Sequence, residues 1–191
     1  ADADFNNIVV AVTGLITPSW TTPLMAYYTD YYWRVQAVRF AELSNWSEPF
    51  KFTTIVDRPS LLAPADEAPG VAVNPTFTLS AVNGATSYRI QIATSVWFTT
   101  IITDVTSAQA SWSEWSESQL ANWSTYYWRA RAANIDGTGA WSTSSIFTTI
   151  IATPPPMTPA NNATWIAVAP SLSWGAIIEA TSYQLEFATD S

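Results

Sequence analysis

The side chains of this sequence that could do chemistry are carboxylates, arginines and tryptophans. The 191 residues include no histidine and no cysteine, and Lys51 is the only lysine. These absences remove the usual general base, the thiol nucleophile and the imidazole metal ligand. A carboxylate pair could act on a glycosidic bond, but the candidates fall in predicted turns or at outward strand positions: Glu114, Glu117, Glu179 and Glu186. We therefore expect no catalytic and no cofactor-binding residues, and we predict that the chain is not an enzyme.

Calcium is the metal that these carboxylates would suit, because it prefers hard oxygen ligands. The candidate ligands are Asp2, Asp4 and Asp190, near the two ends of the sequence. They would converge only if the end of one chain met the start of another. We expect solvated turns at these positions, with a calcium site as the alternative.

Three Asn-x-Ser/Thr sequences are candidate N-glycosylation sites in predicted loops. Their asparagines are Asn45, Asn122 and Asn162. Such short patterns also arise by chance in a chain rich in serine and threonine. Glycosylation is therefore a hypothesis, which an intact-mass measurement would test.

The amino-acid composition indicates which classes of partner and which location are expected for the protein. There are 7 basic and 15 acidic residues, a net charge of −8, so we expect no nucleic-acid partner. Charged residues make up 12% of the chain, and a surface built from uncharged polar residues is common in extracellular β-proteins. No apolar run approaches the roughly 18 residues of a membrane span, so we predict no membrane insertion in this segment. An extracellular or cell-surface location fits these features.

The sequence repeats itself with a period of 95 residues. The stretch YYWRVQA at 31–37 returns as YYWRARA at 126–132, and FTTI at 52–55 returns at 147–150. Proline-rich stretches at 57–70 and 152–164 are the natural linkers. The expected domains are the C-terminal half of a module (1–56), a complete module (57–151) and the N-terminal half of a further module (152–191).

The two half modules allow two explanations. The sequence starts without an initiator methionine or a signal-peptide pattern, which favours a mature product or a window of a longer repetitive fibre. Alternatively, successive subunits complete each other's sandwich by donating strands. The first explanation is the simpler one.

Short strands separated by turn signals fill the complete module. Apolar and polar residues alternate at 76–82, 87–94 and 125–133, and β-branched or aromatic runs occupy 98–105 and 144–151. No helical period competes with this pattern. The sequence therefore predicts an all-β fold in which each module is a two-sheet β-sandwich.

These strands resemble the fibronectin type III family, in the form found in prokaryotic surface and secreted proteins. The resemblance rests on the motifs PSLSW (170–174), GATSYRIQIAT (84–94), YYWRARAAN (126–134), Leu120 followed by Tyr126, and Trp-Ser followed by FTT. It covers nearly the whole chain. The fold that it implies is all-β, with tandem immunoglobulin-like (fibronectin type III) β-sandwiches.

The resemblance also implies structural roles for individual residues. Leu120 and Tyr126 match the family's tyrosine corner, in which the hydroxyl bonds to nearby backbone, and Tyr31 holds the same place in the first half module. Trp174 matches a core tryptophan whose place in the complete module is taken by Leu79. We expect Trp128 and Trp33, two residues after each corner tyrosine, to point inward and supply core volume.

Alternation along the strand at 125–133 fixes which groups face outward. If Tyr126 and Trp128 point into the core, Arg129 and Arg131 point out, and Trp141 can stack over their guanidinium groups. Arg34 and Trp46 repeat this arrangement 95 residues earlier. We interpret the stacking as sheet stabilisation, with a ligand site as the alternative.

Six tryptophans fall near predicted loops or linkers: Trp20, Trp97, Trp112, Trp115, Trp123 and Trp165. Contacts between modules or subunits explain them most simply, and stacking on sugars is the alternative. The predicted function is a non-catalytic structural repeat region of an extracellular or cell-surface fibre, whose partners are neighbouring repeats or other copies of itself. The alternative is a carbohydrate- or protein-binding accessory module of a secreted enzyme, adhesin or phage tail protein, with glycans as partners.

Overall fold

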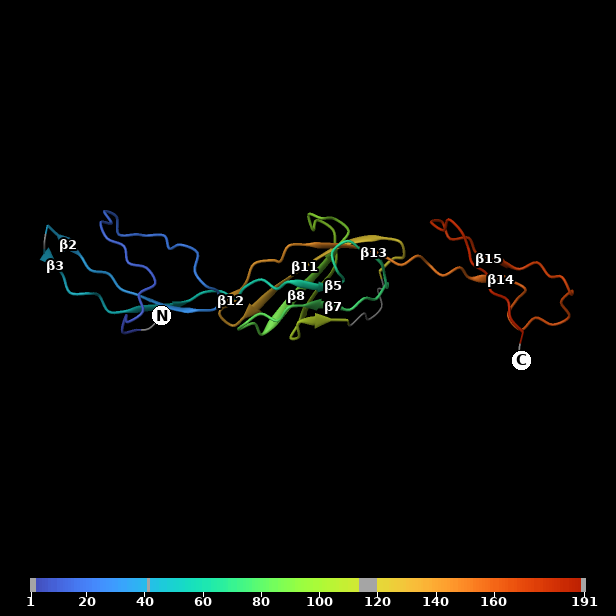
Figure 1. Cartoon of the computed structure of the whole chain (residues 1–191), viewed down its shortest axis with the longest axis horizontal. Helices are drawn as coiled ribbons and strands as arrows, with labels where there is room; N and C mark the ends of the chain where they lie inside the picture. Colours follow the sequence, from blue (N-terminus) through green and yellow to red (C-terminus); the bar gives the residue numbers. More distant parts are fainter. Residues whose placement is uncertain (1–2, 41, 114–119, 190–191) are drawn as a thin grey trace.

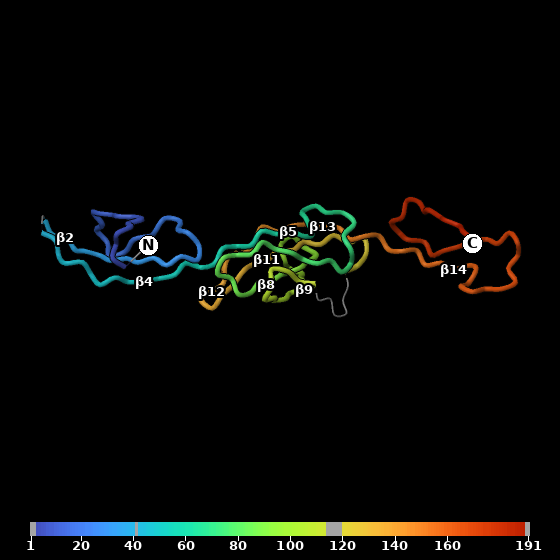
Figure 2. Tube along the Cα trace, turned by 60° about the horizontal axis from the view of Figure 1, so that its bottom comes forward, coloured from blue at the N-terminus to red at the C-terminus, as the bar shows by residue number. Residues whose placement is uncertain are grey.

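The structure, a computed structural model, describes residues 3–40, 42–113 and 120–189, and these residues form strands, turns and loops without a helix. The described part of the chain is therefore all-β, as the sequence predicts. Figure 1 shows three parts in a row: an N-terminal segment, a central sandwich and a C-terminal segment. The row persists in the turned view of Figure 2, so the two outer parts lie on opposite sides of the sandwich.

The central sandwich consists of two sheets. The larger sheet has the order β6-β13-β11-β8-β9, with β12 paired to β11, and the smaller sheet has the order β10-β7-β5. All pairs are antiparallel except β6 with β13, which is parallel. The strands are β5 (Leu61–Ala63), β6 (Ala68–Val71), β7 (Phe77–Leu79), β8 (Ser87–Ala93), β9 (Ile101–Ser107), β10 (Ser111–Trp112), β11 (Thr125–Asn134), β12 (Gly137–Thr138) and β13 (Ser145–Thr149).

Strict alternation along β11 separates the core face of the larger sheet from its outer face. Every second residue from Tyr126 to Ala132 is buried, while the residues between them are partly exposed. The smaller sheet closes the core, where the ring of Phe77 meets the fully buried indole of Trp128 edge-on at 4.9 Å between centroids. Leu79 is buried beside them. The indole of Trp128 thus occupies the centre of the core.

The outer segments contain short strand pairs whose registers match those of the sandwich. The N-terminal strands are β1 (Asp30–Trp33), β2 (Val38–Arg39), β3 (Glu42–Leu43) and β4 (Phe50–Thr53), and the C-terminal strands are β14 (Pro156–Thr158) and β15 (Ser173–Trp174). In β1 and β4, Tyr31 lies opposite Phe52, as Tyr126 lies opposite Phe147 in β11 and β13. In β14 and β15, Pro156 lies opposite Trp174, as Leu61 lies opposite Leu79. Each pair therefore follows the 95-residue period.

The expectation that Trp33 points into a core is wrong for this structure, where 48% of its surface is exposed. Its ring packs against that of Phe50, at 5.6 Å between centroids. Among the described residues no second sheet lies over β1 and β4, whereas β11 is covered by the smaller sheet, and this difference explains the exposure of Trp33. Trp174 is half-buried, with an edge-on contact to Tyr183 at 5.5 Å.

The N-terminal segment meets the sandwich through its linker. Val56, one residue before the expected module boundary, is fully buried in the sandwich core. The ring of Tyr28 lies against Gly84, which has a φ of +75°, and a Cβ at this glycine would collide with that ring. A larger residue at position 84 would therefore strain both the turn and the junction.

Candidate functional site

The outer face of the larger sheet carries the two arginines of β11 that the sequence predicts to stack with Trp141. Arg129 and Arg131 lie on β11, with Gln91 and Arg89 of β8 directly opposite them. Asp104 of β9 lies opposite Gln91. With two aromatic side chains they form what we call the arginine ladder: Arg89, Gln91, Phe98, Asp104, Arg129, Arg131 and Trp141.

Two aromatic rings enclose the guanidinium of Arg129. Its Cζ lies 4.0 Å from the ring centroid of Phe98 and 4.3 Å from that of Trp141, and the Cζ of Arg131 lies 4.6 Å from the Trp141 ring. Phe98 reaches this position from a turn in which its φ is 55°, and it is 8% exposed. The stacking of Trp141 over both arginines is the geometry that strand alternation predicts.

A chain of hydrogen bonds runs across three strands beneath these rings. Nε and Nη2 of Arg129 donate to Oε1 of Gln91 at 3.0 and 2.8 Å. Nε2 of Gln91 donates to Oδ2 of Asp104 at 2.9 Å. Arg89 completes the chain by donating to both oxygens of Asp104, at 2.7 and 2.6 Å. Gln91 is therefore satisfied at both ends although it is buried.

The ladder shifts the pKa values of its own members. The hydrogen bonds from Arg89, and secondarily that from Gln91, lower the pKa of Asp104 below its ordinary value. Partial burial, followed by the nearby charge of Arg131, lowers the pKa of Arg129. The charged form of the Asp104 carboxylate is thus stabilised mainly by the guanidinium of Arg89.

The N-terminal segment contains a similar contact of one arginine with two aromatic rings. The Cζ of Arg34 lies 4.1 Å from the ring centroid of Phe5 and 4.7 Å from that of Trp46. Sequence reasoning missed Phe5 and Phe98, which both have positive φ values. The signal that could have found them is the pattern Phe-x2-Ile-x3-Val-Thr at residues 5–13 and 98–106, which recurs after 93 residues instead of 95.

The tyrosine hydroxyls accept hydrogen bonds from backbone at equivalent places. The N–H of Ala121 donates to Tyr126 at 3.0 Å and that of Ala26 donates to Tyr31 at 3.1 Å, and Leu120 is buried beside the first of these bonds. The sequence did not predict a second pair of such bonds, from Val82 to Tyr88 at 2.9 Å and from Ile177 to Tyr183 at 2.8 Å. These bonds anchor the loop before each strand.

The other candidate residues lie apart from the ladder. Asn45, Asn122 and Asn162 are exposed, and Nδ2 of Asn122 donates to the carbonyl oxygen of Ile150 at 3.0 Å. Asp4 is exposed, while Asp2 and Asp190 lie outside the described residues. Within residues 3–40, 42–113 and 120–189 no group of three acidic side chains could hold a metal ion.

The loop tryptophans separate into three groups. Trp112 lies on β10 rather than in a loop and packs against Phe77 at 6.1 Å between centroids. The strongly exposed ones stay on the surface: Trp20, Trp97, Trp123 and Trp165. Trp115 lies outside the described residues, as do Glu114 and Glu117.

Among the described residues, neither of the two surface hollows beside residues 57–61 holds a pair of carboxylates. Two open hollows border residues 57–61, and Asp57 is the one carboxylate in the lining of each. Glu179 and Glu186 are exposed in the C-terminal segment. No helix able to span a bilayer occurs in the part of the chain that the structure describes.

Comparison with known families supports the assignment of the central sandwich. A sequence model of the family described as Rha78A-like, N-terminal immunoglobulin domain, matches residues 78–152, from β7 to just beyond β13. No curated protein matches the chain. The sheet topology together with this family match identifies the central sandwich as immunoglobulin-like.

Solved structures that are similar to parts of the chain have low sequence identity and low TM-scores. Streptomyces avermitilis alpha-L-rhamnosidase, complexed with L-rhamnose, is 22% identical with a TM-score of 0.39, and the match covers 50% of this chain and 10% of that one. The FN1–FN3 domains of chicken CNTN1 are 16% identical with a TM-score of 0.35, covering 81% of this chain and 54% of theirs. Domains d3–d4 of the rat CD45 extracellular region are 12% identical with a TM-score of 0.36, covering 78% and 86%. The chain therefore spans a tenth of the rhamnosidase and about half of the CNTN1 fragment.

Proposed function

We propose that this chain is a non-catalytic accessory region of an extracellular protein, of the kind that accompanies the catalytic domain of a secreted carbohydrate-active enzyme. The observation that carries the proposal is the arginine ladder, whose charged groups are bonded to one another and covered by rings. Arg129 has both its faces and two of its nitrogens occupied by the protein itself. Such a face stabilises a sheet and offers no acid–base pair to a substrate.

The family match supports the same role, since the matching family is described as an N-terminal immunoglobulin domain. A sandwich of this kind would act by holding neighbouring domains in place or by contacting glycan. The exposed tryptophans Trp97 and Trp165 are the side chains that would stack on a sugar ring, because 83% and 100% of their surfaces face solvent.

The accessory role is tested by measuring hydrolysis and binding on one preparation of the 191-residue chain. We expect no hydrolysis of an aryl α-L-rhamnoside above the rate in buffer. Titration with rhamnose-containing polysaccharides, followed by tryptophan fluorescence, checks for glycan contact, and Trp97→Ala should remove any shift that Trp20→Ala leaves in place. Hydrolysis that survives further purification and is lost on unfolding would contradict a non-catalytic role.

A second candidate is a structural repeat region of a surface fibre, favoured by the recurrence of the same contacts after 95 residues. The hydroxyl bonds of Tyr31 and Tyr126, and the stacks on Arg34 and Arg129, are the clearest cases. A denaturing gel of the source material tests this role. A polypeptide far heavier than 20.9 kDa supports a longer repeat array. A band near that mass leaves self-assembly as the only route to a fibre.

A further inference from the structure

The described residues of the N-terminal segment include no counterpart of the strand that fills the middle of the larger sheet in the sandwich. In the sandwich, β8 lies between β9 and β11. Residues 32–38 correspond to β11 after a shift of 95, and residues 8–14 correspond to β9 after a shift of 93. Yet residues 8–14 form no strand, and β1 pairs with β4 alone. The backbone edge that β8 covers in the sandwich is therefore unpaired in this segment.

The C-terminal segment carries the counterpart of β8 and leaves it exposed. Residues 182–188 match β8 after a shift of 95, and they form no strand. Their apolar side chains Tyr183, Leu185 and Phe187 are 41%, 57% and 80% exposed. The equivalent residues of β8 are buried in the sandwich core: Tyr88, Ile90 and Ile92.

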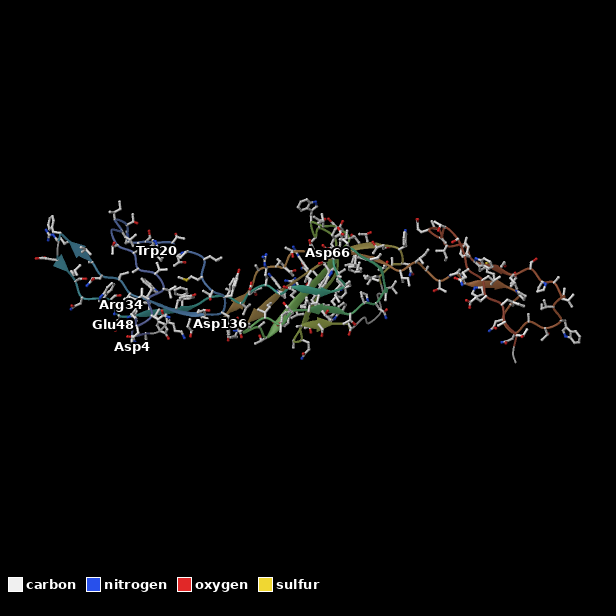
Figure 3. The ribbon with its side chains drawn as sticks, viewed as in Figure 1. Asp4, Trp20, Arg34, Glu48, Asp66 and Asp136 are labelled. Atoms are coloured by element: carbon white, nitrogen blue, oxygen red, sulfur yellow. The ribbon has the colours of Figure 1, made fainter. Side chains whose placement is uncertain are left out.

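The two segments lie apart in one copy of the chain. Figures 1 and 2 show the N-terminal and C-terminal segments on opposite sides of the sandwich. Figure 3 labels Arg34 in the N-terminal part, away from the C-terminal segment. Among the described residues of one copy, none is therefore placed to pair with the open edge.

We propose that residues 182–188 of one copy insert between residues 8–14 and residues 32–38 of a second copy, as the missing strand of the larger sheet. The registers of the sandwich fix the pairing. Because Ile92, Gln91 and Ile90 lie opposite Trp128, Arg129 and Ala130, the inserted strand sets Phe187 opposite Trp33, Glu186 opposite Arg34 and Leu185 opposite Val35. On its other edge, the pairing of Ile90 with Val105 sets Leu185 opposite Val12.

The apolar side chains fit this insertion. Trp33 is 48% exposed although its equivalent Trp128 is fully buried. Phe187 and Trp33 would meet on the core face, as Ile92 and Trp128 do in the sandwich. The C-terminal segment would also bring β14 and β15, which match β5 and β7 of the smaller sheet. One contact between copies would thus complete both layers around Trp33.

The charges fit as well. Arg129 donates two hydrogen bonds to the neutral Gln91, but the equivalent pair between copies is Arg34 with the carboxylate of Glu186. Among the described residues Arg34 has rings on its guanidinium but no hydrogen bond or ion pair. Insertion would therefore add an ion pair between the rings of Phe5 and Trp46, where partial burial strengthens it.

This contact joins the C-terminal segment of one copy to the N-terminal segment of the next. Because the two surfaces differ, the contact does not close on itself and would build a linear chain of copies. The inference goes beyond the accessory role, which needs no second copy. It also differs from a long covalent repeat array, because the 191-residue chain alone should assemble.

Sedimentation of the purified 191-residue chain over a range of concentrations tests the proposal. We expect a mass that rises above 20.9 kDa with concentration. Leu185→Asp should weaken the association by about 100-fold or more, because a charge would enter the core face. The matched control is Ile178→Asp, which changes a 95% exposed residue in the turn before the strand. Far-ultraviolet circular dichroism of each variant verifies that the sandwich remains folded.

Charge reversal tests the register. Arg34→Glu or Glu186→Arg alone should weaken association by about tenfold or more, and the double variant Arg34→Glu/Glu186→Arg should restore most of it. A chain that stays at 20.9 kDa at every concentration overturns the proposal. So does association that Leu185→Asp leaves unchanged, or that the double reversal fails to restore. Glycan binding and hydrolysis are measured separately, so either proposal can fail without the other.

Discussion

Arg129 and Gln91 face each other across β11 and β8, and the guanidinium donates two hydrogen bonds to Oε1 of Gln91, at 3.0 and 2.8 Å. Rings of Phe98 and Trp141 cover the same guanidinium on either side. The contacts of the Arg129 guanidinium are therefore expected to stabilise the sheet. We therefore expect substitutions in the arginine ladder to lower the free energy of unfolding. Four comparisons between variants test this expectation and the contributions of core residues.

Trp141→Ala should lower the free energy of unfolding by about 1–2 kcal/mol, because the two arginines lose a cation–π contact that is partly shielded from water. Trp97→Ala is the control, since 83% of that side chain is already exposed. Urea unfolding followed by circular dichroism measures both. Equal effects of the two substitutions would show that the stack on Arg129 and Arg131 contributes nothing measurable.

Tyr126→Phe should cost about 1–2 kcal/mol, because the N–H of Ala121 loses the hydroxyl that accepts its hydrogen bond. The neighbouring Tyr127→Phe removes a hydroxyl from the outer face of β11 and should cost less than about 0.5 kcal/mol. Thermal unfolding of both variants is the measurement. A larger loss for Tyr127→Phe is the result that contradicts the corner's role.

Trp128→Ala should cost about 3–5 kcal/mol, because it opens a large cavity in the centre of the core. Trp128→Phe should cost less, since it keeps an aromatic ring and removes an indole N–H that has no hydrogen-bond partner among the described residues. Trp33→Ala is the matched change 95 residues earlier, and at low protein concentration it should leave the unfolding of the sandwich nearly unchanged. Similar losses at positions 33 and 128 would contradict the difference in burial.

Asp104 should make the stability of the sandwich depend on pH in the acid range. Its pKa is lowered on folding, chiefly by Arg89, so the carboxylate stabilises the folded state above its ordinary pKa of 3.8. That stabilisation is lost as the pH falls through the lower pKa of the folded state. Asp104→Asn should therefore be less stable than the original chain at pH 6, and the gap should narrow below pH 3.8.

The control for the acid range is Asp136→Asn, an exposed carboxylate in the turn between β11 and β12. This variant removes one carboxylate outside the arginine ladder, so it controls for the loss of a negative charge. Urea unfolding at a series of pH values measures both variants. A gap for Asp104→Asn that does not change with pH would show that the bonds from Arg89 contribute no stability.

The strands could be located from sequence because their signals are local. Alternation around Trp128 marks the core face of β11, and the same alternation puts Arg129 and Arg131 outside beside Trp141. The all-β class and the immunoglobulin-like sandwich follow from such patterns, since a strand has a period of two and its buried face must meet another sheet.

The other members of the arginine ladder could not be predicted, because they join it through contacts between segments far apart in the sequence. Phe98 joins the ladder from a turn with positive φ, and nothing in the period of 95 residues points to it. Gln91 and Asp104 become one network only because β8 lies between β9 and β11. The strand order, and not the identity of either residue, decides that pairing.

The sequence by itself determined the period of the chain, the strands and the inward or outward position of each residue along them. The tertiary structure decided which inward residues are buried. Trp33 and Trp128 stand at the same place in identical YYWR motifs, yet 48% of the first is exposed and none of the second. Burial requires a second sheet and a neighbouring strand at the right distance, and only the residues around Trp128 have both.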